Sequence, residues 1–251
     1  MSAILITARY SLLRMVRNVG SLVAFLGLPL FIIPLLGSVF SQIPADTPYL
    51  KGAANTMTFF AIGMLLMFQL FGGSYAMQGV TVAFLTPRKW RMHALPCRPV
   101  HIVLGILLAS TVLSLAQGLL LAGFSTFALG ARFGGFFVVA LVIFGIALLS
   151  QLIGLTLLLA VRSTVGAFVL GWIVAYGSAL LGGIVFPLPA DSAFFRFTST
   201  WGTPFSLAQT ALLASSRGGP AGTIALSILA LFGASAVFGC LTALAGRRRL
   251  A

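Results

Sequence analysis

Long apolar runs, separated by short polar segments, make up most of the chain. Each run is long enough, at about 18 to 25 residues, to cross a hydrocarbon layer of about 30 Å as a helix. The runs are continuous rather than alternating, which excludes the strands of a transmembrane barrel. The pattern predicts one transmembrane domain over residues 1–251, an all-α polytopic membrane protein with spans at about 21–40, 56–77, 102–124, 135–160, 165–186 and 222–245.

Composition supports this interpretation. Hydrophobic residues make up 60% of the chain and charged residues 7%, and the mean hydropathy is +1.13. A soluble protein of this size lacks the polar surface to cover so much apolar material. The net charge of +13 is of a kind often seen in nucleic-acid-binding proteins. Here the basic residues lie between apolar spans, so membrane topology explains them and we expect no nucleic-acid partner.

The distribution of Lys and Arg predicts the orientation. If the N-terminus is cytoplasmic, only four of the fifteen basic residues fall outside, which leaves eleven inside. Cytoplasmic loops carry such an excess. The first run lacks a small-residue cleavage site, so we interpret it as a span rather than a removed signal. We therefore expect both termini in the cytoplasm. The outer basic residues are Lys51, Arg132, Arg196 and Arg217, and the only two acids, Asp46 and Asp191, also fall outside.

The first twenty residues have the pattern of an amphipathic helix. Arg9, Arg14 and Arg17 fall on one side at 100° per residue, and apolar residues such as Ile4 and Leu12 fall on the other. A helix of this kind lies in the membrane interface with its arginines toward lipid phosphates. The alternative is an ordinary start to the first span.

The segment 187–221 is too polar to span, although it is rich in Phe, Trp and Leu. Thr203 and Pro204 resemble a helix N-cap followed by a first-turn proline. We expect a short helix from there through about Ser215. On the outer side it would dip into the outer leaflet or rest on it, as a short re-entrant helix before the last span.

Small residues recur every fourth position in the fifth predicted span. Such a stripe lets another helix approach closely, because van der Waals contact drives helix association in lipid. The partner is either a neighbouring helix, which we favour, or a second subunit. The stripe consists of Ala167, Gly171, Ala175, Ala179 and Gly183.

The segment 85–101 is the most polar long stretch between two spans. Thr86 can cap a helix that starts at Pro87, and Pro96 ends it after about two turns. This helix, 87–94, would be basic and would carry Trp90 at the cytoplasmic face. One interpretation is a rigid lever that a cytoplasmic motor pushes. The other is that its charges only enforce topology and bind anionic lipid.

Several kinds of chemistry have no sequence signal. The chain has no G-x-x-x-x-G-K-[ST] phosphate loop. Neither acid lies within a predicted span, which disfavours an ion-driven carrier. His93 and His101 belong to no metal-ligand cluster, and no nucleophile–base–acid set can be assembled. We therefore predict that the chain is not an enzyme and holds no metal or cofactor.

Two stretches then point to a known family. "TPRKWRMHALPCRPVHIVLGILLA" (86–109) and "GSALLGGIVFPLP" (177–189) resemble motifs of the membrane subunits of ABC exporters of the type-2 permease family. Those subunits have an interfacial N-terminal helix, six spans, a cytoplasmic coupling helix between spans two and three, and outer re-entrant helices before span six. Members commonly carry an acid just before the coupling helix. Residues 78–101 contain none, and Gln78 or Thr81 stands in that region.

The resemblance implies partners. Two copies of a separate ATPase subunit would hold ATP and Mg²⁺, and a second permease, identical or related, would complete the pathway. Contact with the ATPase would be made by Pro87, Arg88, Lys89, Trp90, Arg91, Met92 and Leu95. Spans one, two and five usually line the pathway, which maps here to Phe59, Phe60, Met64, Met67, Phe68, Phe71, Trp172 and Tyr176. The alternative for these side chains is core packing or lipid contact.

The sequence thus predicts the permease subunit of an ATP-driven exporter in a bacterial inner membrane. An apolar, aromatic path suits an amphiphilic or hydrophobic cargo such as a drug, a lipid or a peptide. One alternative is a permease of similar layout for cofactor or haem maturation. Another, from a different class, is a membrane scaffold or immunity protein that transports nothing.

Overall fold

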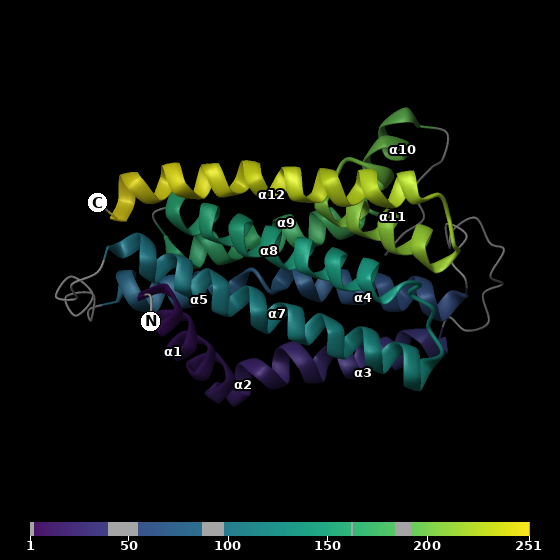
Figure 1. The fold of residues 1–251 in the computed structure, drawn as a ribbon, viewed down its shortest axis with the longest axis horizontal. Coiled ribbons are helices and arrows are strands. Elements are labelled where there is room, and N and C mark those ends of the chain that lie inside the picture. The colour runs from purple at the N-terminus through teal and green to yellow at the C-terminus, as the bar shows by residue number, and fades with distance from the viewer. Residues whose placement is uncertain (1–2, 40–54, 87–97, 162, 184–191, 251) are drawn as a thin grey trace.

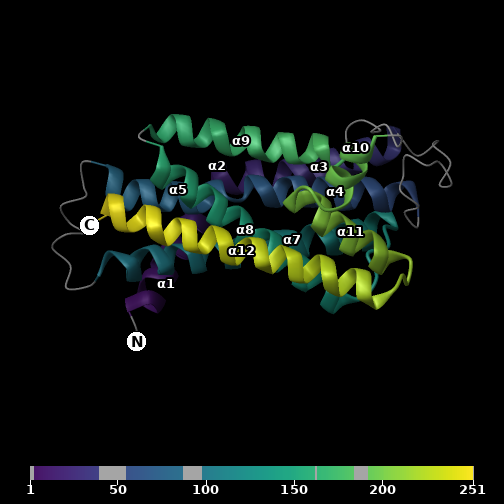
Figure 2. The same ribbon diagram turned by 90° about the horizontal axis from the view of Figure 1, so that it is seen from above.

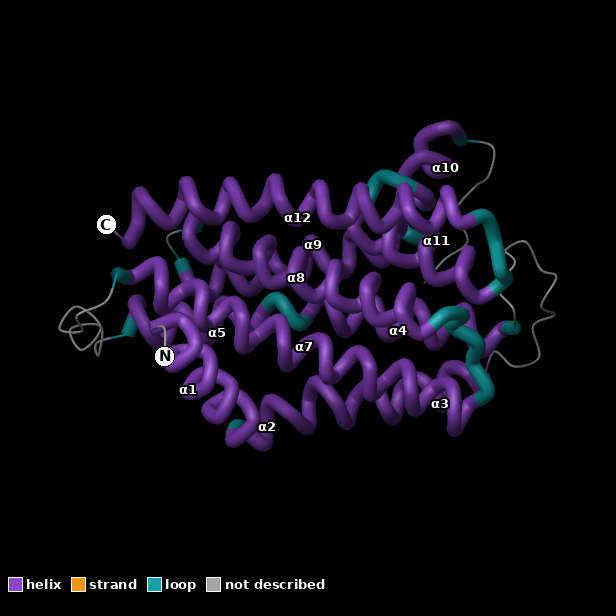
Figure 3. The backbone as a smooth tube through the Cα atoms, in the orientation of Figure 1, coloured by secondary structure: helices purple, strands orange, loops and turns teal. Residues whose placement is uncertain are grey.

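The computed structural model describes residues 3–39, 55–86, 98–161, 163–183 and 192–250. Every regular element in these ranges is a helix. Most of them run along one axis and form an elongated bundle (Figures 1 and 3). The chain is therefore all-helical where it is described, as the apolar runs predict.

Five helices in the described ranges are long and apolar enough to cross a membrane. They correspond to the second to sixth predicted spans, and apart from the end of the second span their ends differ by five residues or fewer. The first of them joins α4 (Thr56–Phe71), α5 (Ser74–Val80) and the π-helical turn η3 (Thr81–Leu85). The other four are α7 (Pro99–Leu129), α8 (Phe136–Ala160), α9 (Thr164–Leu181) and α12 (Ala221–Leu250).

The first predicted span, 21–40, is less regular. It contains α2 (Val19–Leu22), the π-helical turn η1 (Val23–Gly27) and α3 (Leu28–Val39), which has Pro34 in its interior. Its apolar helical stretch, Phe25–Val39, is shorter than the other five. Gln117 of α7 donates a hydrogen bond of 2.6 Å to the carbonyl of Phe25, which lies in the π-helical turn η1. The six-span layout stays a prediction.

The second span is longer than the sequence suggests. We expected it to end near residue 77, and it continues as helix to Leu85. The reason is burial, because Val80, Ala83 and Phe84 pack in a cluster with Ile102 and Ile106 of α7. The predicted cytoplasmic segment therefore begins as helix.

The N-terminal helix α1 (Ala3–Arg17) lies at an angle to the bundle and packs on α7 (Figure 1). The contact is made at Gly105, where a Cβ atom would come within 2.6 Å of Thr7 Cβ and 2.8 Å of the Ile4 carbonyl oxygen. The three arginines of α1 are exposed. This agrees with the predicted amphipathic helix, whose place in the interface stays a prediction.

Replacing Gly105 with leucine is expected to displace α1 from α7, because part of the obstructing surface is backbone. Overpacking of this kind costs about 1–3 kcal/mol, so amide exchange in residues 3–17 should accelerate by roughly tenfold. Hydrogen exchange of the purified protein measures this. The matched control is Gly123→Leu on the same helix, where a Cβ has no neighbour within 4 Å. Equal protection of α1 in both variants would contradict the contact.

Two short helices precede α12 at the other end of the bundle. These are α10 (Ala193–Thr200) and α11 (Pro204–Ser216). The predicted cap is confirmed: Thr203 accepts a hydrogen bond from the Ser206 amide, and Pro204 occupies the first turn. Phe205 and Leu212 are fully buried, so α11 is inserted among α4, α8, α9 and α12.

The core lies around α8, which contacts α4, α5, α7, α9, α11 and α12. Figure 2 shows α9 and α12 on opposite sides of α8. The fully buried side chains in this core include Ile143, Ile146 and Leu149 of α8. Each of the other spanning helices therefore packs against α8, and the second span, Thr56–Leu85, is the most deeply buried of them.

Candidate functional site: an irregular second span and its aromatic face

The predicted coupling helix, with Pro87, Trp90 and Leu95, lies outside the described residues. So do the other members of that set, Arg88, Lys89, Arg91 and Met92, and the end of the second family-like stretch, 184–189. The structure does describe the helix that leads into the coupling segment. Its irregularities are the candidate site.

The second span tightens at Gly72 and Gly73, between α4 and α5. There the Gly73 amide donates to the Leu70 carbonyl at 3.3 Å and the Tyr75 amide to that of Gly72 at 2.9 Å. The Gly72 amide is shared between the carbonyls of Phe68 at 3.0 Å and Gln69 at 3.1 Å, so the bonds to Leu70, Gly72 and Gln69 each span three residues. These are three-residue bonds of the 3₁₀ type, which in the middle of a helix often mark a hinge.

A side chain of α8 enters the helix at this point. In a regular helix the Ala76 amide would donate to the Gly72 carbonyl. Here the Ala76 amide donates to Gln151 Oε1 at 3.0 Å, and Gln151 Nε2 donates to the Gly72 carbonyl at 2.9 Å. The Gln151 amide thus replaces the missing backbone bond from both sides. Insertion of a side chain into the bonding ladder is a recognised cause of a helix kink.

Two more polar side chains complete the cluster, which we call the glutamine hub and define as Gln69, Ser114 and Gln151. Gln151 also donates to Ser114 Oγ at 2.9 Å, and Gln69 donates to the Ser114 carbonyl at 2.9 Å. Gln69, Ser114 and Gln151 are all buried. Ser114 is the sixteenth of the 31 residues of α7, so the hub lies at the middle of the bundle.

The backbones of the second span and α8 are in contact beside the hub. A Cβ on Gly73 would collide with the carbonyl oxygen of Ser150, and a Cβ on Gly154 would lie 2.6 Å from the carbonyl oxygen of Gly73. Only glycine at both positions permits this approach, which brings Gln151 within reach of the open turn.

An aromatic cluster covers the same region of the second span on the side of α9. The Phe71 ring lies 5.1 Å from both Trp172 and Tyr176 between centroids, and 6.3 Å from Phe68. Trp172 and Tyr176 are about half exposed, at 52% and 44%. The structure therefore brings four of the eight predicted pathway residues together, and two of these present apolar surface to the outside.

The other four predicted pathway residues lie in or against the core. Phe59 and Phe60 are 0% and 4% exposed, and Met64 and Met67 pack against the same cluster. The role of all eight residues in a pathway stays a prediction, because it concerns a surface that a second subunit would complete.

The small-residue stripe of α9 faces the interior of the chain. Ala167, Ala175 and Ala179 are 0%, 2% and 0% exposed, and Gly171 is partly buried. The predicted fifth member, Gly183, is buried but lies in a turn beyond the end of α9 at Leu181, because the chain takes a positive φ there. A Cβ on Gly171 would approach Met77 Sδ at 3.9 Å. The stripe thus contacts neighbouring helices, and Ile173 on the opposite face of α9 is 60% exposed.

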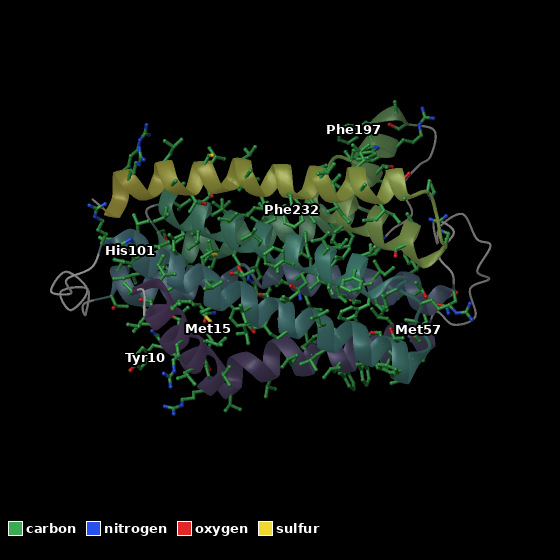
Figure 4. All side chains as sticks on the ribbon, viewed as in Figure 1. Tyr10, Met15, Met57, His101, Phe197 and Phe232 are labelled. Carbon is green, nitrogen blue, oxygen red and sulfur yellow. The ribbon has the colours of Figure 1, made fainter. Side chains whose placement is uncertain are left out.

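Basic residues gather at one end of the bundle. The N-terminus, the C-terminus and the start of α7, marked by His101, lie together there, opposite Met57 (Figures 1 and 4). The described arginines at this end are Arg9, Arg14, Arg17, Arg98, Arg247 and Arg248, and those at the other end are Arg132, Arg196 and Arg217. The asymmetry inferred from the spans is thus present in three dimensions.

A family model described as ABC-2 family transporter protein matches residues 41–244. The chain belongs to the ABC-2 family. It is therefore a multi-pass membrane protein and a permease subunit of an ABC transporter. Subunits of this family are generally not catalytic and work with ABC ATPase subunits. Comparisons with curated proteins and with solved structures found no match.

Sequence reasoning missed the glutamine hub of this ABC-2 permease. The available signal was the position of Gln69, Gln117 and Gln151, each of which stands in or beside apolar residues within a predicted span. Polar side chains at membrane depth are costly and usually have a partner. Their partners here are mostly backbone carbonyls and amides of other helices, which no pattern of side chains reveals.

Proposed function

We propose that this permease belongs to an ATP-driven exporter of amphiphilic or hydrophobic cargo in a bacterial inner membrane. Two ATPase subunits would bind ATP and Mg²⁺, and this chain would bind neither. A second permease, identical or related, would complete the path. The observation that carries the proposal is the irregular second span, which leads directly into the basic segment 87–97.

The orientation follows from charge. Both termini and the start of α7 lie at the end of the bundle that is richer in arginine, and cytoplasmic ends of membrane proteins carry this excess. An even number of spans, as in the six-span layout, also places the two termini on one side. We therefore assign that end to the cytoplasm, where an ATPase would meet segment 87–97.

The second permease would contact this chain on the side formed by α3 and α9. α4 lies between α3 and α9 and contacts both. Phe31 of α3 is 70% exposed, and Trp172 and Ile173 of α9 are 52% and 60% exposed. Spans one and five, which both pack on span two, thus each leave apolar side chains uncovered. A path between two such faces would suit a cargo with an apolar part.

Movement would reach this face through the second span. A force from the ATPase on segment 87–97 would act along η3 and α5. The second span would then bend at the tight turn formed by Gly72 and Gly73. Phe71 stands just before that turn and contacts Trp172 and Tyr176. Bending at the turn would therefore change the aromatic face.

The proposal is tested by Trp90→Ala, which removes an aromatic contact of segment 87–97 and keeps its basic residues. If the segment docks in a groove of the ATPase, we expect normal membrane insertion and a several-fold loss of efflux per ATP hydrolysed. The measurement is ATPase activity and efflux of an amphiphilic dye by the reconstituted complex.

The control variant is Trp201→Ala, the same change at the opposite end of the bundle, which should keep the ratio of efflux to hydrolysis. If Trp90→Ala behaves as wild type while Arg91→Gln and Arg98→Gln are equally harmful, the segment is an electrostatic anchor. The coupling assignment is then wrong.

A further inference from the structure

A groove of about 600 Å³ opens at the arginine-rich end of the bundle, on the side away from the aromatic face. Its walls are α7 and α12, and its floor is α8. Both walls pack on α8, and they make no extensive contact with each other. α12 is held in place by a hydrogen bond of 2.8 Å between Thr156 and Thr242.

The interior of the groove is apolar, and its side chains are buried on the floor and exposed on the wall. Leu155 and Leu159 of the floor are 0% and 5% exposed, whereas Val100 and Leu104 on the wall are 61% and 42% exposed. On the opposite wall, Gly239 and Gly246 leave the groove wide, since a Cβ on either would meet only a leucine methyl at 4.0 or 3.8 Å. Apolar surface is thus accessible from the side of the bundle.

The mouth of the groove is positively charged. Arg98 at the start of α7 and Arg247 near the end of α12 both line it, and both are exposed. No acidic residue occurs among the described residues, since the only two are at positions 46 and 191. The two guanidinium groups therefore lack a carboxylate side chain in this region, and an anion would complement them.

The length of the groove matches half a bilayer. From Arg98 to Leu107 along α7 the rise is about 14 Å, at 1.5 Å per residue. One leaflet of a hydrocarbon core of about 30 Å is roughly 15 Å thick. A ligand with a phosphate at the arginines would therefore place its chain along the apolar groove within one leaflet.

We propose that the groove between α7 and α12 binds one anionic phospholipid, with its phosphate between Arg98 and Arg247 and an acyl chain on the α8 leucines. The lipid comes from the leaflet at this end of the bundle, which is the cytoplasmic one in the orientation proposed above. Bound there, it bridges two helices that otherwise meet only through α8. Lipid binding at this site requires neither ATPase nor cargo.

The test measures lipid retention by native mass spectrometry of the purified chain, taken from vesicles of equal parts phosphatidylglycerol and phosphatidylcholine. Wild type should retain phosphatidylglycerol preferentially. Loss of one basic residue near a lipid surface weakens attraction about fivefold, so Arg98→Gln with Arg247→Gln should reduce this preference about 30-fold. Arg248→Gln, beside the groove but not lining it, should change it little.

A second variant tests the apolar part. Gly239→Leu fills the groove without a close contact and keeps both arginines, so it should reduce retention of phosphatidylglycerol. Gly233→Leu, on the same helix where a Cβ has no neighbour within 4 Å, should not. Equal retention of both lipids by wild type overturns the proposal.

Two further results would also overturn it. One is unchanged retention in the double arginine variant. The other is unchanged retention in Gly239→Leu, which would mean that the acyl chain does not lie in the groove. Because retention is read without transport, a chain that exports nothing can still confirm the lipid site.

Discussion

Replacing Gly73 with alanine is expected to force the second span away from α8 and to destabilise the permease by about 3 kcal/mol, the upper end of typical overpacking costs. The new methyl group would collide with the carbonyl oxygen of Ser150. That atom belongs to the backbone of a buried helix, so it cannot rotate away as a side chain would. For a chain of this size the loss corresponds to a fall in Tm of roughly 6–12 °C.

Thermal loss of monodisperse protein in detergent measures this effect. Gly233→Ala and Gly123→Ala are matched controls, because a Cβ at either position has no neighbour within 4 Å. Alanine is the better helix former by about 1 kcal/mol, so the controls should be as stable as wild type or slightly more so. A Gly73→Ala protein with unchanged Tm would show that the two backbones are not in contact.

Replacing Gln151 with methionine is expected to destabilise the permease by about 2 kcal/mol, or roughly 4–8 °C in Tm. Methionine has similar length but cannot make the bonds of the amide. The Ala76 amide then loses its acceptor, and Ser114 Oγ loses a donor. An unsatisfied buried polar group costs about 1–3 kcal/mol, although interhelical hydrogen bonds in membranes often contribute less than this.

The control is Gln78→Met, the same substitution one half-turn beyond Ala76, because the Gln78 side chain is exposed. It should leave Tm within about 1 °C, as surface changes usually do. Equal stability of Gln151→Met and wild type would contradict a structural role for the hub. If Gln151→Met had both the stability and the activity of wild type, the second span would work as a regular helix.

Several features were determined by the sequence alone. Apolar runs that are long enough to cross the bilayer predict the positions of the helices, because a backbone in lipid must satisfy its own hydrogen bonds. The predicted cap at Thr203 and Pro204 begins α11 for a local reason, since an N-cap depends on neighbours three residues away. The grouping of arginines at one end follows from where the loops fall along the chain.

The tertiary structure decided the rest. Nothing in the order of residues pairs Gln151 with Gly72, because the two are 79 positions apart and meet only after α8 packs on the second span. Of the predicted pathway residues, Phe71, Trp172 and Tyr176 meet, whereas Phe59 is buried. Hydropathy predicts where each helix crosses the membrane. It does not distinguish the faces of a helix that is apolar on all sides. Which face is buried depends on steric fit between helices, and here glycines permit that fit at Gly73, Gly105 and Gly154.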